Sequence, residues 1–343
     1  MPELSIVLTT WNSLSHIRKC LESILSLDMS EVETIVVDSN STDGTKEYLE
    51  ALSHSLEASK LGLKVLLSHR RIKWSEANQI GLDHSNGDWV CLSNPDIIFN
   101  ESFLKMLESC SRSNALVAAP QLISPDGSPQ GPMRLVTPSV FFLSSTGTGA
   151  VIRRILGSRL PSYWVHYEWN GEDMVQVDNP AGSFFMVHRR VLNMFNGRLW
   201  NRGYLNGVSD LDAFLNFKRH GIPVNLFPSC RMVHYASHIT RKNRSWVEYD
   251  QSYGIVLYYR YWKMSPRLST ALLGIEGILA VPLEIMLKIV KPRQPFFSPR
   301  LRAWKAGQRL MGLLDGWRFP IARMIHPHLY DTEQAMSAVP ASL

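Results

Sequence analysis

The sequence predicts an α/β protein in which a mostly parallel sheet carries helices on both faces and is followed by a basic, helical C-terminal region. Two observations predict the sheet: apolar runs typical of buried strands alternate with helical periodicity, and polar residues follow several of these runs. A third observation, the charge distribution, marks off the C-terminal region. Residues 241–330 hold 15 Lys and Arg against 5 Asp and Glu, whereas residues 1–240 hold 21 against 23.

The first part of the chain alternates strands with helices. Residues 4–9 form an apolar run bounded by polar residues, which is typical of a buried strand. Residues 17–25 then place Ile, Cys and Leu at helical spacing behind Asn12, Ser13 and Ser15, any of which can cap a helix. We expect further strands at 33–38, 63–68, 88–93 and 115–119, and further helices at 45–52, 74–84 and 101–110. Because helices separate the strands, the strands are expected to run parallel.

Periodicity fails between about residues 120 and 176, where Pro, Gly and Ser accumulate. An irregular stretch of this length in a compact protein indicates a substrate-facing loop region. Regular patterns return with an apolar run at 182–188 and a helix at 212–219 that Gly221 closes. A short strand is expected at 224–227, ahead of His234.

We expect the C-terminal region, residues 241–343, to be distinct from a domain formed by residues 1–240. Residues 269–290 are largely apolar and about long enough to span a bilayer, but they contain Pro282 and several charges. On a helix these charges fall on one face, formed by Glu276, Glu284, Lys288 and Lys291. This favours an amphipathic helix in a membrane interface, and a helix packed on the protein's own core is the alternative. Flanking Arg and Lys residues favour the membrane surface.

Composition argues against several classes of protein. Hydrophobic residues make up 45% of the chain, which is ordinary for a folded protein and argues against disorder. The cysteines are widely spaced, at positions 20, 91, 110 and 230, so we expect neither a disulfide framework nor a zinc site. The sequence does not open with a basic segment, an apolar run and a cleavage site. We therefore expect a cytoplasmic protein, held peripherally on the inner face of the cell membrane.

Polar side chains follow three of the expected strands, at the sheet edge where a parallel α/β sheet has its ligand crevice. Thr9 and Asn12 follow the first strand, Asp38 ends the second, and Asn94 and Asp96 follow the fourth. The first strand is not followed by GxGxxG, and the chain has no GxxxxGKS or GxxxxGKT, so neither a dinucleotide fold nor a P-loop is supported. We expect phosphates to be held instead by Mg²⁺ or Mn²⁺ that bridges a carboxylate to a diphosphate.

A series of motifs carries a resemblance to a known family. The first four are Ser5-Ile-Val-Leu-Thr-Thr-Trp-Asn12, Ile35-Val-Val-Asp-Ser-Asn-Ser-Thr-Asp-Gly44, Ala77-Asn-Gln-Ile-Gly81 and Leu92-Ser-Asn-Pro-Asp96. Three later segments extend the series, namely Gly182-Ser-Phe-Phe-Met-Val-His-Arg189, Ser209-Asp-Leu-Asp212 and Met232-Val-His234. Over about residues 3–240 the chain resembles inverting family 2 glycosyltransferases of the GT-A fold, which have a Rossmann-like sheet. It is most similar to their non-processive, rhamnosyltransferase-like branch.

The resemblance implies which residues bind the donor, a nucleoside diphosphate sugar. Thr9, Trp11 and Asp38 would line the nucleoside pocket, with Asp38 accepting a hydrogen bond from the base or ribose and the Trp11 indole packing on the ring. Asn78 and either Arg71 or Arg70 would face the base and the phosphates, and Asn94 occupies the first position of the family's DXD-like metal motif.

The resemblance also implies a metal site and a general base. Asp96 would bind Mg²⁺ or Mn²⁺, with His234 as a second ligand. Asp210 matches the family's general base, which takes a proton from the acceptor hydroxyl. Ser209 stands where the family usually has Glu, so Asp212 would supply the supporting carboxylate.

The expected reaction moves one sugar, with inversion, to a glycan or lipid-linked acceptor in polysaccharide biosynthesis at the cell envelope. A processive synthase is not expected, because no QxxRW-like motif follows Asp210. The alternative is a catalytically silent subunit that binds sugar nucleotide or glycan in a membrane assembly complex, which Ser209 favours. The basic, aromatic tail could also stack on nucleic-acid bases. The same mixture is typical of a membrane-interface anchor, so nucleic acid is not the expected partner.

Overall fold

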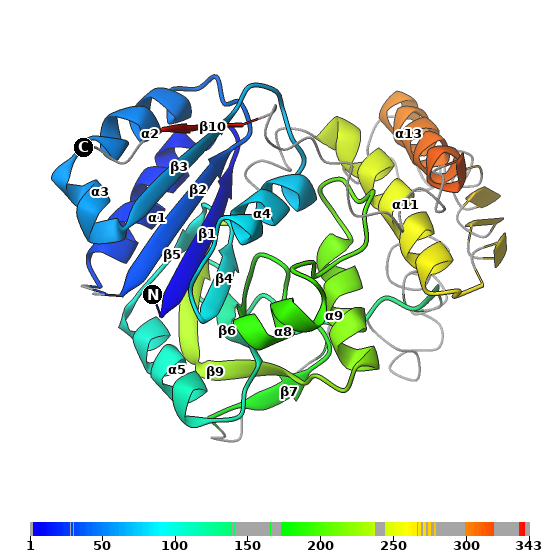
Figure 1. The fold of residues 1–343 in the computed structure, drawn as a ribbon. Coiled ribbons are helices and arrows are strands. Elements are labelled where there is room, and N and C mark those ends of the chain that lie inside the picture. Colours follow the sequence, from blue (N-terminus) through cyan, green and yellow to red (C-terminus); the bar gives the residue numbers. More distant parts are fainter. Residues whose placement is uncertain are drawn as a thin grey trace.

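Ten strands form one mixed sheet within the part of the chain that the computed structural model describes (Figure 1). The strand order is β10-β3-β2-β1-β4-β8-β6-β9-β5, and β7 pairs with β9. The described residues are 3–27, 29, 31–138, 140, 165, 173–236, 244–265, 267–268, 270–271, 274–275, 278, 299–318 and 336–339.

The elements of the first 120 residues begin and end close to their predicted bounds. The strands are β1 (Leu4–Thr10), β2 (Val32–Asp38), β3 (Leu63–Ser68), β4 (Trp89–Ser93), β5 (Ile97–Ile98), β6 (Val117–Ile123), β7 (Val175–Val177), β8 (Phe184–His188), β9 (Val224–His234) and β10 (Met336–Val339). The helices are α1 (Leu14–Leu25), α2 (Thr45–Ser53), α3 (Leu56–Leu61), α4 (Trp74–Asp83), α5 (Glu101–Arg112), α8 (Arg189–Met194), α9 (Ser209–Arg219), α11 (Arg244–Tyr261) and α13 (Pro299–Arg318). The short elements α3, β5, β7, α8 and β10 were not predicted.

Helices cover both faces of the sheet, which confirms the predicted fold class (Figure 1). Successive side chains of β1 point to opposite faces: Ile6 and Leu8 join a core with α1, α3 and α5, and Val7 joins a core with α4, α8, α9 and α11. A side chain at Gly81 of α4 would collide with Val7. The backbone of α4 therefore packs on β1 more closely than a residue with a side chain would allow. The first turn of the helix lies near the carboxyl end of that strand.

The prediction of a mostly parallel sheet is confirmed for β3, β2, β1 and β4 and for the pair β6 and β9, but antiparallel strands interrupt the sheet beyond β4. There β8 runs antiparallel between β4 and β6, and β5 and β7 run antiparallel to β9. The run 184–188 is buried almost throughout, so its pattern contains no information on strand direction.

The strand β9 is longer than predicted, because it continues past Phe227 to His234. Its pairing with β6 shifts register between Pro120 and Gln121, which lets the strand bend and continue. The extension places His234 opposite Ile97 of β5.

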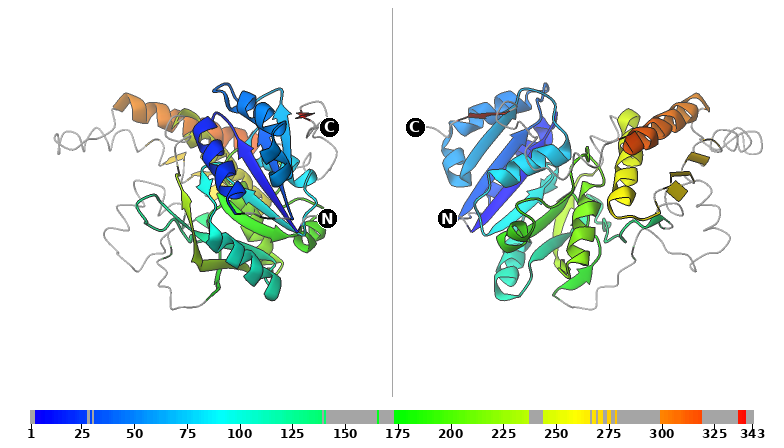
Figure 2. Two further views of the ribbon diagram at one scale, coloured as in Figure 1. Left: turned by 90° about the vertical axis from the view of Figure 1, so that its left-hand side faces the viewer. Right: turned by 45° about the vertical axis from the view of Figure 1, so that its right-hand side comes forward.

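The C-terminal helices α11 and α13 pack against each other at one end of the molecule (Figure 2). Ile255, Val256 and Tyr258 of α11 are buried in the same core as α9. A division at residue 240 stays a prediction, although α11 shares its core with the sheet. Most of the expected interfacial segment 269–290 lies outside the described residues, and so does most of 141–172. Among the described helices, none combines the length and apolar character needed to cross a bilayer.

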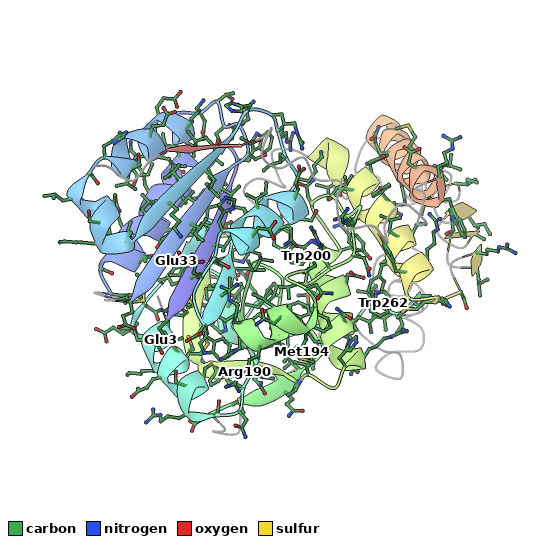
Figure 3. All side chains as sticks on the ribbon, in the orientation of Figure 1. Glu3, Glu33, Arg190, Met194, Trp200 and Trp262 are labelled. Carbon is green, nitrogen blue, oxygen red and sulfur yellow. The ribbon has the colours of Figure 1, made fainter. Side chains whose placement is uncertain are left out.

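Glu33 is the centre of a buried polar cluster at the amino ends of β1 and β2, away from the strand ends where ligands bind (Figure 3). The Ser5 hydroxyl donates to it at 2.6 Å, the N–H of Asn86 at 2.5 Å and the Lys64 ammonium at 2.6 Å. Burial alone would raise the pKa of Glu33, but these donors outweigh burial and hold it below its usual value. The charged carboxylate thus ties three strands together.

Replacing the Glu33 carboxylate should destabilise the protein only at pH values at which this carboxylate is ionised. We expect Glu33→Gln to lower the free energy of unfolding by about 2 kcal/mol at pH 7, because charge-assisted hydrogen bonds are lost. A lowered native pKa stabilises the fold above the unfolded-state pKa of about 4.3, and this contribution disappears as pH falls through the native pKa. Urea unfolding at pH 7 and at pH 3.5 should therefore show a smaller difference at the lower pH.

The matched control is Glu108→Gln, which removes a surface ion pair on α5. Exposed pairs of this kind contribute little, so the control should unfold like the wild type. Two results would contradict the role of Glu33. One is an equal loss of unfolding free energy in Glu33→Gln and Glu108→Gln, and the other is a loss in Glu33→Gln that does not change with pH.

Candidate active site

A cleft of about 560 Å³ opens at the carboxyl ends of β1 and β4. Loops and helix starts that follow strands form most of its wall, and two residues of α11 complete it. The lining residues are 9–11, 39, 71–74, 77, 94–96, 133, 136, 181–183, 206–208, 210, 211, 234, 251 and 255. The cleft therefore lies at the sheet edge that the sequence indicated.

Thr9, Trp11 and Arg71 line the cleft, as expected for a donor site. The guanidinium carbon of Arg71 lies 3.5 Å from the centroid of the Trp11 ring, so cation and ring stack. Arg70 instead pairs with Glu76 at 2.5 Å and lies outside the lining. Of the two arginines that the sequence left open, the structure places Arg71 at the cleft.

Asp38 lies behind the cleft lining, with its carboxylate fully buried. The N–H and hydroxyl of Ser41 donate to it at 2.9 and 2.5 Å, and the N–H of Asn12 donates to the same hydroxyl at 2.8 Å. Burial raises the pKa of Asp38, while the hydrogen bonds from Ser41 lower it. Asp38 thus holds the turn next to Trp11, and its direct contact with a nucleoside stays a prediction.

The start of α4 supplies two lining residues that the sequence analysis missed, Lys73 and Trp74. The Trp74 indole donates to Asn94 Oδ1 at 3.1 Å, which fixes the Asn94 side chain at the cleft wall. Asn78, a predicted donor-facing residue, lies behind the wall and donates to the Trp74 carbonyl at 2.9 Å. The basic run from Arg70 to Lys73, directly after the third strand, was the signal that could have identified Lys73.

Asp96 and His234 meet in the cleft. His234 Nε2 lies 3.3 Å from Asp96 Oδ1, and this oxygen is buried without a hydrogen-bond partner. The pairing of β5 with β9 and the hydrogen bond from the N–H of Tyr235 to the Asp96 carbonyl hold the two residues at this separation.

Gln130 determines which nitrogen of His234 faces Asp96. The Gln130 amide nitrogen donates to the His234 carbonyl and to Ser124 Oγ, both at 2.9 Å, so its oxygen must serve as the acceptor. That oxygen lies 2.6 Å from His234 Nδ1, so Nδ1 is the nitrogen that donates to it. Nε2 is then the nitrogen left to face the Asp96 oxygen that has no hydrogen-bond partner, and a cation bound between them would satisfy both atoms.

The two residues therefore fit a divalent cation. The described residues contain no group of three or more His, Cys, Asp or Glu side chains that could hold a metal ion. Two protein ligands suit Mg²⁺ or Mn²⁺ that takes its other ligands from water and a diphosphate.

Asp210 enters the cleft from the first turn of α9. Burial raises its pKa, and the N–H groups of Leu211, Asp210 itself and Gly182 lower it. Gly182 has no room for a side chain, because a Cβ atom there would collide with the Asp210 carboxylate. A partly buried carboxylate with a raised pKa is a stronger base than one in water, provided that it is ionised.

Asp212 lies outside the cleft lining and is fully buried. It accepts hydrogen bonds from the N–H of Asn201 at 2.6 Å, the Tyr204 hydroxyl at 3.0 Å and the Trp262 indole at 2.5 Å. Burial raises the pKa of Asp212 to about 6 against the effect of these donors. The structure gives Asp212 contacts that hold α9, and its role as a second catalytic carboxylate stays a prediction.

Known proteins resemble the chain in sequence. Residues 5–192 match the family model for glycosyl transferase family 2. The GalNAc(5)-diNAcBac-PP-undecaprenol beta-1,3-glucosyltransferase of Campylobacter jejuni is 27% identical over 129 residues, which are 37% of this chain and 40% of that protein. Glycosyltransferase AglE of Haloferax volcanii is 26% identical over 107 residues, 31% of this chain and 34% of the relative. The match thus spans less than half the length of these relatives.

One solved structure with a similar arrangement is the mannosyltransferase PcManGT of Pyrobaculum calidifontis in complex with GDP-Man and Mn²⁺. It superposes with a TM-score of 0.48 at 13% identity, over 93% of this chain and 88% of that one. Residues 1–349 of TarS from S. aureus superpose with a TM-score of 0.47 at 15% identity, over 97% and 77% of the two chains.

The crowding at Gly182 predicts a specific loss of activity. In Gly182→Ala the added methyl group must displace the Asp210 carboxylate, and a displacement of about 1 Å can reduce turnover about a hundredfold. We expect kcat to fall by this order while the melting temperature stays within a few degrees. The control is Gly307→Ala on α13, where a methyl group meets nothing within 4 Å. A Gly182→Ala variant with wild-type kcat would show that Asp210 does not need this position.

Proposed function

This chain belongs to glycosyl transferase family 2, and on that premise we propose that it moves one sugar, with inversion, from a nucleoside diphosphate sugar to a glycan or lipid-linked acceptor. The observation that carries the proposal is that Asp210 and the Asp96–His234 pair line one cleft, although they come from α9, from the turn between β4 and β5, and from β9. Such a transfer needs a carboxylate that acts as the base and a pair of side chains that can bind a cation.

The donor's nucleoside and phosphates take the wall formed by the ends of β1 and β3. The stacked Trp11 and Arg71 offer a flat, positively charged surface to the base. Lys73 directly precedes α4 and lines the cleft beside its first turn, where the helix dipole also favours negative charge. Asn94, fixed by Trp74, adds a polar group to the same wall. These residues support binding of a diphosphate.

Asp96 and His234 would hold Mg²⁺ or Mn²⁺ next to this wall, through the carboxylate oxygen without a partner and the ring nitrogen that faces it. When bound, the cation offsets the negative charge that develops on the departing diphosphate. Gln130 keeps the ring of His234 turned so that Nε2 faces Asp96.

Asp210 would act as the general base. The acceptor oxygen forms its bond to the anomeric carbon as the bond from that carbon to the diphosphate breaks, and the hydroxyl proton passes to the Asp210 carboxylate. One displacement of this kind inverts the anomeric configuration and needs no covalent enzyme intermediate. Gly182 leaves the space that the carboxylate occupies, and its N–H steadies the ionised form.

The acceptor is proposed to be lipid-linked and the protein to rest on the inner face of the cell membrane. The name of the Campylobacter relative includes a PP-undecaprenol-linked glycan, which supports such an acceptor. In this chain α13 exposes Met311 and Leu314, which lie one turn apart on a strongly basic segment. Apolar side chains among basic ones suit the headgroup region of an anionic bilayer.

Loss of the base should abolish turnover but not donor binding. We expect Asp210→Asn to lower kcat by about a hundredfold or more, because the amide cannot accept the proton. The measurement is release of nucleoside diphosphate from a panel of UDP-, GDP- and dTDP-sugars with Mn²⁺. For the wild type, kcat should rise with pH through the raised pKa of Asp210, since only the ionised carboxylate is a base. The Asp210→Asn variant should not show this rise of kcat with pH.

The comparison variant is Asp96→Asn, which should weaken Mn²⁺-dependent binding of nucleoside diphosphate in calorimetry, whereas Asp210→Asn should bind it within about twofold of the wild type. Turnover that survives in Asp210→Asn would remove Asp210 from the mechanism. A wild-type protein that binds a donor but converts none would instead favour a catalytically silent binding subunit.

The membrane proposal predicts binding to anionic vesicles through α13. We expect the wild type to sediment with phosphatidylglycerol vesicles and Met311→Glu/Leu314→Glu to bind them at least about tenfold more weakly, because two apolar contacts are replaced by charges. The control is Leu56→Glu on α3, which is 83% exposed and lies at the opposite end of the molecule (Figure 2). The result that would point to nucleic acid instead has two parts. Polynucleotide would release the wild type from the vesicles, and Met311→Glu/Leu314→Glu and Leu56→Glu would both bind vesicles as the wild type does.

A further inference from the structure

The turn Asn206–Val208, directly before α9, has an unusual backbone. Val208 has φ +72° and ψ −17°, in the left-handed region that a β-branched residue seldom adopts. Val208 lies two residues before Asp210 and lines the cleft with it. A residue in this conformation persists only where its surroundings hold it, so the neighbours of the turn determine the direction in which α9 starts.

On one side the turn is held by the start of α4. The N–H of Ser75 donates to the Leu205 carbonyl at 3.1 Å, and the Ser75 hydroxyl donates to the Tyr204 carbonyl at 2.6 Å. The N–H of Trp74 donates to Asn206 Oδ1 at 3.2 Å. This side therefore connects the turn to the donor wall.

On the other side the turn is held by α11. Asp250 is buried, and its carboxylate accepts the N–H of Asn206 at 3.2 Å. Burial raises the pKa of Asp250 to about 6, whereas the N–H groups of Asn206 and Gly207 and the charge of Lys73 lower it. The backbone N–H groups of the turn thus point at a carboxylate on the C-terminal helix.

One turn further along α11, Gly254 meets the turn directly. A Cβ atom at Gly254 would lie 2.9 Å from Val208 Cγ2, 3.1 Å from Val208 Cβ and 3.2 Å from the Gly207 carbonyl oxygen. The valine side chain therefore packs on the helix backbone itself. Neighbouring residues of α11, Gln251 and Ile255, line the cleft.

We propose that α11 positions Asp210 by clamping the turn Asn206–Val208 between Asp250 and Gly254. Asp250 and Gly254 are positioning residues, because they act on the base through the turn. The inference rests on the proposed role of Asp210 as general base. Asp210 has little tolerance for a shift, since it already fills the space beside Gly182. A small rotation at Val208 therefore moves the carboxylate out of its place.

The test is a double-mutant cycle in the full-length protein. In Gly254→Ala the methyl group meets Val208, and we expect kcat to fall at least tenfold while the donor KM stays within twofold, because the nearest neighbours of the added atom belong to the turn and not to the donor wall. Val208→Gly removes both valine atoms involved and lets the turn adopt positive φ freely. In that background, adding Gly254→Ala should change kcat by less than about threefold.

A second variant covers the case in which Gly254→Ala does not fold. Asp250→Asn keeps size and one acceptor oxygen, and it should lower kcat with an unchanged donor KM and an unchanged affinity for nucleoside diphosphate with Mn²⁺. Gly307→Ala is the control for a glycine substitution within a helix of the C-terminal region, and it should behave as the wild type.

The inference fails if Gly254→Ala leaves kcat unchanged, if its effect is the same with and without the Val208 side chain, or if a folded Asp250→Asn variant has wild-type kcat. Its failure is distinct from failure of the proposed function. Turnover that survives in Asp210→Asn removes the base assignment, whereas loss in Asp210→Asn with wild-type behaviour of the α11 variants removes only the clamp.

Discussion

The pairing of β5 with β9 is the constraint on which the site depends. It sets Ile97 opposite His234, and the N–H of Tyr235 donates to the carbonyl of Asp96, so backbone hydrogen bonds hold together two residues that lie far apart in the sequence. In turn, β9 is fixed by its parallel pairing with β6 inside the sheet. Asp96 and His234 are therefore held as rigidly as the core, which suits the cation site proposed for them, because sites supported by strands are more precise than sites on loops.

Three glycines allow the helices α4, α9 and α11 to pack closely around the site. Each glycine lies near a different part of the wall of the cleft. Gly81 lets α4 pack on β1, which places the start of that helix beside the residues proposed to bind the donor. Gly182 leaves room for the Asp210 carboxylate, and Gly254 lets α11 meet the turn before α9. Dense packing of this kind transmits small changes in volume, so the positions of the site residues depend on contacts that involve no charge. A sequence pattern shows these glycines but not the atoms that they accommodate.

The sequence predicted most of the fold because its central strands are apolar runs and its first helices have clear periodicity. It did not predict that β8 runs antiparallel, since a strand buried on both faces has the same pattern in either direction. At the site it identified the residues at strand ends, but Asp38 and Asn78 lie behind the wall, because spacing does not determine which way a side chain points. Gln130 could not be found at all. It lies in an irregular stretch, and its contact with His234 exists only once the fold has brought them together.

Helix geometry explains why the two acidic residues of α9 differ. Residues two positions apart on an α-helix point about 200° apart, so Asp210 and Asp212 cannot both face the cleft. Asp210 is the one that faces it, and Asp212 faces inward to the Tyr204 hydroxyl and the Trp262 indole. Trp262 follows α11, so this helix is tied to α9 both at the turn before Asp210 and at the carboxylate after it. The proposed clamp therefore needs no second acid beside Asp210, because packing of α11 against the turn, and not a neighbouring charge, would hold the carboxylate in place.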